Sequence, residues 1–190
     1  MANLGLLGGA FDPPHVGHLV VAEGVQWALG LDEVRFVVAG DPRHKPVRTP
    51  ADTRLELVRL ATADNDAFVV DDREALRDGP TWTFDTLSEL RAEQPDDRFF
   101  FILGADAVAE LPTWHRADEL PDLATFVAVE RPGFELPRER PVQLRVNIVR
   151  LPQLDISSSD LRERYARGRP TRYLVPDAVD QYVRAAGLYR

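Results

Sequence analysis

Short apolar runs alternate with segments of helical period along the whole chain, and this alternation restricts the fold more than any other feature. Strands are predicted at 3–7, 33–38 and 68–70, and the runs 99–103 and 125–129 are typical of strands buried on both faces. The alternating apolar residues Leu144, Val146 and Ile148 mark a last strand. Helices are expected at 18–29, 83–92, 157–166 and 176–186. A further helix is expected to begin at Pro50, with Thr49 as its cap residue. This order predicts an α/β fold with a parallel sheet covered on both faces.

The size and charge of the chain narrow the classes of protein it can belong to. A chain of 190 residues suits one core, and the proline-rich segment 131–141 is too short to separate domains, so a single domain over 1–190 is expected. The net charge of −8 opposes binding to nucleic acid. No apolar run is long enough to span a membrane and no signal peptide is apparent, so a cytoplasmic protein is expected. The lack of cysteine excludes thiolate chemistry.

The segment 8–18 follows the first predicted strand, at the edge where open α/β sheets bind ligands. Gly8 and Gly9 let the backbone approach a ligand closely, and the amides that begin the next helix favour an anion. His15 and His18, with Gly17 between them, can donate hydrogen bonds to phosphate oxygens. A turn with a capping histidine is the simpler alternative, but it does not account for the whole group of residues.

Two other phosphate-binding motifs do not fit this segment. The glycines at 5, 8 and 9 lack the G-x-G-x-x-G spacing of a dinucleotide-binding dehydrogenase, and no acidic residue ends a second strand where one is needed. No glycine-lysine-Ser/Thr triplet is present, which excludes a P-loop.

Three further segments carry polar groups that could serve a phosphate ligand. Ser157 and Ser158 precede a helical pattern and offer a cap, and Arg162 lies one turn into that helix as a permanent cation. The loop 40–46 holds His44 and Lys45, although a solvated loop is equally consistent with its composition. The turn 104–107 contains Asp106, which could equally be a residue that begins a helix.

Two signatures of one family occur in the right order. His15-Val16-Gly17-His18 resembles the HxGH signature of the nucleotidyltransferase superfamily, and the longer run 8–18 resembles its nicotinate-nucleotide adenylyltransferase branch. Residues 156–162 resemble the second signature, ISSTxxR, with Ser159 in place of threonine. The resemblance implies a Rossmann-like, doubly wound domain that moves AMP from ATP to nicotinate mononucleotide, giving deamido-NAD and pyrophosphate.

The resemblance also assigns roles to residues. It implies catalytic roles for His15, His18, Lys45 and Arg162, and completion of the ATP site by the helical part 157–190. ATP would be bound by residues of both signatures and of the 104–106 turn, namely Gly8, Gly9, Ala10, Phe11, His18, Gly104, Asp106, Ile156, Ser157, Ser158 and Arg162. Mg²⁺ is expected to arrive with ATP, and no carboxylate cage for a metal is apparent in the sequence.

Two elements resemble the family's acceptor site. Residues 81–87 resemble YTxxTL, with Trp82 where tyrosine is usual, and residues 111–120 resemble LxxWxRxxEL. The resemblance implies that Trp114 stacks on the pyridine ring and that amides near Thr83 and Trp114 receive the nicotinate carboxylate. His44 and His115 are also expected at the acceptor. A nicotinamide-mononucleotide or pantetheine-type adenylyltransferase, a non-catalytic nucleotide-binding regulator and a homo-oligomer stay open as alternatives.

Overall fold

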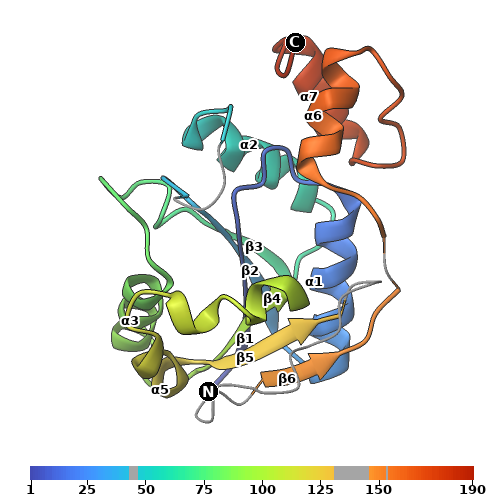
Figure 1. Ribbon diagram of the computed structural model, residues 1–190. Helices are drawn as coiled ribbons and strands as arrows, with labels where there is room; N and C mark the ends of the chain where they lie inside the picture. Colours follow the sequence, from blue (N-terminus) through green and yellow to red (C-terminus); the bar gives the residue numbers. More distant parts are fainter. Residues whose placement is uncertain (43–46, 131–145, 153) are drawn as a thin grey trace.

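The computed structural model describes residues 1–42, 47–130, 146–152 and 154–190 (Figure 1). Six strands form one parallel sheet in the order β3-β2-β1-β4-β5-β6. The strands are β1 (Asn3–Gly9), β2 (Glu33–Val38), β3 (Phe68–Asp71), β4 (Arg98–Gly104), β5 (Thr125–Val129) and β6 (Val146–Val149). The single doubly wound α/β domain predicted from the alternating pattern is therefore present, and each predicted apolar run that the structure describes forms a strand.

Helices cover both faces of the sheet. α1 (Val16–Leu29) and α2 (Ala51–Thr62) pack on one face, where Val25 and Val58 join Phe36 and Val127 in one core. α3 (Thr83–Glu93) covers the other face, where Leu87 packs against Phe101. Short helical turns also lie between β4 and β5: α4 (Ala105–Val108), η1 (Leu111–Thr113), η2 (Ala117–Glu119) and α5 (Leu120–Leu123).

The last two helices form a layer of their own. α6 (Ser158–Ala166) and α7 (Asp177–Ala185) lie side by side next to α2, away from the sheet (Figure 1). Leu161, Val179 and Val183 bury their side chains against Leu57 and Ala61 of α2 in a third apolar cluster. The segment after residue 157 is thus held by α2, and it lies beyond the carboxyl ends of β1 and β2 (Figure 1).

The start of α2 differs from the prediction. Pro50 is the cap residue and the helix begins at Ala51, one residue later than expected. The first helical bond runs from the Arg54 amide to the Pro50 carbonyl at 3.0 Å. The Thr49 carbonyl instead accepts the Arg54 side chain at 3.0 Å, so Thr49 lies outside the helix.

Candidate active site

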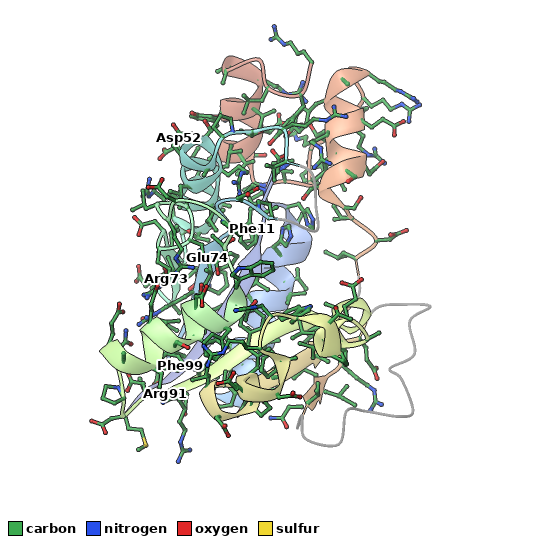
Figure 2. The ribbon with its side chains drawn as sticks, turned by 60° about the vertical axis from the view of Figure 1, so that its left-hand side comes forward. Phe11, Asp52, Arg73, Glu74, Arg91 and Phe99 are labelled. Atoms are coloured by element: carbon green, nitrogen blue, oxygen red, sulfur yellow. The ribbon has the colours of Figure 1, made fainter. Side chains whose placement is uncertain are left out.

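The turn after β1 is built around a buried aromatic ring. Phe11 is only 2% exposed and has a left-handed backbone conformation, with φ of 50°. The ring of Phe11, a residue labelled in Figure 2, lies edge-on to the ring of His18, with ring centroids 5.0 Å apart. A Cβ at position 9 would lie 2.9 Å from this ring, so only glycine lets the chain pass. The turn is therefore shaped by contacts between its own residues.

The two histidines lie against each other. Their rings stack with centroids 3.7 Å apart, and the backbone amide of His15 donates to Nδ1 of His18 at 3.2 Å. Because Nδ1 accepts this hydrogen bond, neutral His18 carries its proton on Nε2. His15 is 4% exposed and His18 is half-buried. His18 is therefore the better placed of the two to donate to a ligand. Gly17 leaves room for the His15 ring, since a Cβ at position 17 would lie 3.0 Å from His15 Nδ1.

Two backbone amides at the start of α1, where an anion was expected to bind, have acceptors within the chain. The amide of Val16 donates to the carbonyl of Leu174 at 3.0 Å, and the amide of His18 donates to the carbonyl of His15 at 2.9 Å. Both groups already have acceptors within the chain. The ligand-binding capacity of this turn therefore depends more on its side chains than the sequence indicated.

The second signature meets the first directly. Ser158 Oγ donates to the carbonyl of Pro13 at 2.9 Å, and Arg162 Nη1 donates to the carbonyl of Asp12 at 2.8 Å. Ser157 caps α6 as predicted, because its side chain accepts from the Asp160 amide at 3.1 Å. Ile156 is half-buried against the α6–α7 cluster. The fold thus places Arg162 beside the histidine turn.

Asp12 connects three parts of this site. Its carboxylate, 1% exposed, accepts from the Tyr189 hydroxyl at 2.7 Å through Oδ1 and from the Arg48 amide at 2.7 Å through Oδ2. Oδ2 also lies 3.9 Å from Arg162 Nη1. Burial, together with the hydrogen bond to Asp12, raises the pKa of Tyr189, which therefore stays a neutral donor. The sequence placed Asp12 in the motif but gave it no role.

A fully buried arginine fastens the turn to the loop after β2. Arg54 Nη1 donates to the carbonyls of Ala10 at 2.8 Å and Ala39 at 2.6 Å, and Nη2 donates to that of Gly40 at 2.9 Å. Sequence reasoning missed this residue. Arg54 lies three residues before Leu57 and four before Val58, so it shares the apolar face of the predicted helix. A charged residue on that face was the sequence feature that could have identified it.

The two predicted acceptor elements lie together. Trp82 is the cap residue of α3, so Thr83 is its first helical residue, and the Trp82 side chain accepts no capping hydrogen bond. The ring of His115, whose side chain is exposed, lies 5.3 Å from that of Trp82. Trp114 is half-buried and meets Phe101 edge-on at 6.0 Å. This arrangement leaves part of the Trp114 ring accessible.

A partly buried carboxylate lies at the start of α3. The carboxylate of Glu74, a residue labelled in Figure 2, accepts from Thr86 Oγ1 through Oε1 at 2.7 Å. Burial raises the pKa of Glu74. The carbonyl of Glu74 would be 2.3 Å from a Cβ at Gly40. The loops after β2 and β3 therefore touch at this point, where only glycine fits.

Some of the predicted residues fall beyond the described ranges. His44 and Lys45 lie outside the described residues. Gly104 ends β4 and caps α4, which contains Asp106, but only the backbone of Asp106 is described. Within the described ranges, no three or more His, Asp or Glu side chains group as metal ligands. Nor does any helix in those ranges have the length and apolar character needed to cross a membrane.

Comparison with known proteins gives consistent matches over the chain. A family model described as cytidylyltransferase-like matches residues 6–164. The nicotinate-nucleotide adenylyltransferase of Bacillus subtilis is 43% identical over 100% of this chain and 99% of its own. The probable nicotinate-nucleotide adenylyltransferase of Thermus thermophilus is 47% identical over 99% of this chain and 100% of its own.

Solved structures share the fold. The Plasmodium falciparum nicotinic acid mononucleotide adenylyltransferase complexed with NaAD superposes with a TM-score of 0.86, covering 100% of this chain and 98% of that one at 20% identity. The same Plasmodium enzyme complexed with APC superposes with a TM-score of 0.83. At this identity the likeness establishes the architecture.

Proposed function

The chain belongs to the nicotinate-nucleotide adenylyltransferase family, and from this premise we infer its reaction and the work of its residues. It is a nucleotidyltransferase that moves AMP from ATP to nicotinate mononucleotide, a step of NAD biosynthesis. The observation in the fold that carries this function is the junction of the two signatures at Asp12. This junction brings a histidine pair and an arginine to one place beyond the sheet.

The chemistry requires charge stabilisation more than a strong base. An oxygen of the acceptor's 5′-phosphate bonds to the α-phosphorus of ATP as the α–β phosphoanhydride bond breaks, and pyrophosphate leaves with that electron pair. The attacking phosphate is already ionised, so no proton needs to be removed. Positioning two anions and stabilising charge on the transferring and leaving groups supply the catalysis.

The described side chains fit this need. We assign His18 Nε2–H and the Arg162 guanidinium to the phosphates of ATP, since both are fixed by hydrogen bonds before any ligand arrives. Sequence resemblance adds His15 and Lys45 to this set, and Gly104 and Asp106 to the nucleotide pocket. Mg²⁺ would enter with ATP, held by its phosphates and neutralising part of their charge. A cytoplasmic location and a homo-oligomer stay predictions.

A nicotinamide-mononucleotide adenylyltransferase is the nearest alternative, and the start of α3 bears on it. The cap residue Trp82 offers the first-turn amides no side-chain acceptor. Those N–H donors suit a carboxylate, because charge-assisted hydrogen bonds are about twice as strong as neutral ones. The NH₂ of nicotinamide would instead face donors and leave one unpaired, at a cost of about 1–3 kcal/mol.

Side-by-side kinetics with the two mononucleotides test this proposal. We expect kcat/KM for nicotinate mononucleotide to exceed that for the nicotinamide form by about tenfold or more. Trp114→Ala should weaken binding of both mononucleotides and change the ratio of their kcat/KM values less, because stacking does not distinguish the ring substituent. Equal efficiencies would mean a dual-specificity enzyme, and binding of ATP without pyrophosphate release would indicate a regulator.

A further inference from the structure

We propose that Tyr189 is a positioning residue for Arg162, acting through the buried carboxylate of Asp12. The inference rests on the proposed function, because Arg162 matters only if it handles the phosphates of ATP. It goes beyond both signatures, since Tyr189 lies in neither and is 177 positions from Asp12.

The contacts form a short chain from the far end of the fold to the phosphate site. The Tyr189 hydroxyl donates to Asp12 Oδ1 at 2.7 Å. The other carboxylate oxygen accepts from the Arg48 amide at 2.7 Å and lies 3.9 Å from Arg162 Nη1. The same Nη1 donates to the Asp12 carbonyl at 2.8 Å. Asp12 therefore holds Arg162 mainly through its backbone, while two donors occupy its carboxylate.

The backbone of Tyr189 has an uncommon conformation. Tyr189 has φ of 62°, a left-handed conformation that a tyrosine seldom adopts, and it is 7% exposed. Such a conformation persists only where surrounding contacts hold it, and it marks a position with a function to examine. The contact that this conformation serves is the hydrogen bond to Asp12.

Loss of the hydroxyl should change the charge balance at Arg162. Without Tyr189, the buried carboxylate keeps its charge but loses the donor on Oδ1. Among the described residues, Arg162 is the cation that lies within 4.0 Å of this carboxylate, and the two groups would draw together, because an unsatisfied buried anion is costly. Arg162 would then be held on Asp12 and withdrawn from the phosphates. The defect should appear on the ATP side of the reaction and not on the acceptor side.

Tyr165→Phe provides a matched control for Tyr189→Phe. The two rings pack together with centroids 5.8 Å apart, and each hydroxyl donates to one aspartate, at 2.9 Å in the case of Tyr165 and Asp180. Asp180 also accepts from Thr171 and Arg184 and has no contact with the signatures among the described interactions. Both variants lose one hydroxyl from the same layer, but only one loses it at Asp12.

The experiment measures the Kd of a non-hydrolysable ATP analogue and the steady-state constants of wild type and both variants, well below their melting temperatures. For Tyr189→Phe we expect about a tenfold weaker analogue Kd and a similar fall in kcat/KM for ATP, with the KM of nicotinate mononucleotide changed less than about twofold. Tyr165→Phe should match wild type in all of these. Equal effects of the two variants, or a parallel loss for both substrates, would overturn the proposal.

A double-mutant cycle gives a second measurement on the same point. If Tyr189 acts through the Asp12 charge, adding Tyr189→Phe to Asp12→Asn should weaken the analogue Kd by less than about twofold further. An additive, roughly tenfold, further loss would show that Tyr189 acts by another route. Analogue binding needs no acceptor, so the proposal is tested even if wild type fails to use nicotinate mononucleotide, which would count against the proposed function alone.

Discussion

At residue 18 a single imidazole is fixed on several sides. The ring of His15 stacks on it at 3.7 Å, the ring of Phe11 meets it edge-on at 5.0 Å, and Nδ1 accepts the His15 amide. These contacts select the tautomer and the ring direction before a substrate binds. A donor held in this way loses little entropy on reaction and stabilises charge in the transition state.

His18→Ala removes that donor. We expect kcat to fall by about 10²–10³, as on loss of one donor to a developing oxyanion. His18→Asn is the matched variant, because its side-chain oxygen can still accept the His15 amide but carries no donor at the Nε2 position, so its kcat should be equally low. Steady-state pyrophosphate release measures both. More than a third of wild-type kcat in either variant would remove His18 from the catalytic residues.

Residues whose hydrogen bonds lie within one short motif are the simplest to predict from the sequence. The histidines and Ser157 act within a few positions of themselves, so a linear motif was enough to find them. Asp12, Arg54 and Tyr189 each have at least one partner 36 or more positions away, in hydrogen bonds such as Arg54 to Ala10 and Tyr189 to Asp12. No local pattern could identify these bonds, because each forms only after the sheet and α2 have brought distant segments together.

At the scale of elements, α2 is the part that joins the site to the fold. Its inner side packs against α6 and α7 through Leu57 and Ala61, while Arg54 at its first turn holds the carbonyls after β1 and β2. One helix therefore supports both the histidine turn and the layer that carries Arg162.

Replacing Arg54 tests that role. Arg54→Met keeps most of the volume but leaves buried carbonyls without donors, so we expect unfolding free energy to fall by about 3–5 kcal/mol. Arg59→Met on the outer side of the same helix is the control. Arg59 is half exposed and its carboxylate contacts are 3.8 and 3.9 Å long, so the change should stay within about 0.5 kcal/mol. Urea unfolding compares them, and equal midpoints would contradict the assignment.

Most of the described elements were predicted to within two residues of their observed bounds. Strand 33–38 and the helix beginning at Thr83 match the structure at their first residues, because burial on a sheet face imposes a clear period. The turns between β4 and β5 escaped prediction, since helices of one turn show no period. Val146 and Ile148 belong to one strand as predicted, but only Val146 is buried, whereas Ile148 is 37% exposed on β6 at the sheet edge.

At the scale of the whole molecule, Glu74 links stability to pH. Burial raises the pKa of Glu74, so the folded chain binds a proton more readily than the unfolded chain does. As pH falls from the raised pKa toward the ordinary value of 4.5, Glu74 therefore increases the free energy of unfolding. This contribution is complete below 4.5 and is lost as pH rises through the raised pKa.

Glu74→Gln isolates this effect. Glutamine can still accept the hydrogen bond from the Thr86 hydroxyl but does not titrate. The free energy of unfolding of the variant, relative to that of wild type, should therefore be highest at neutral pH. That difference should shrink as pH falls toward 4.5. Urea unfolding of both proteins across this range measures it. A difference that grows in acid would mean that the carboxylate stabilises the fold and that its pKa is lowered.

The hydrogen bond between Tyr189 and Asp12 also imposes an order in time. The residues are 177 positions apart, and a ribosome adding about 5–20 residues per second makes Tyr189 about 10–35 s after Asp12. Through that interval the nascent chain can pair β1 with β2 and β4, yet its catalytic turn still lacks the hydroxyl donor. Each new molecule therefore gains a finished phosphate site only once translation has passed this tyrosine, after both strands that flank β1 have been made.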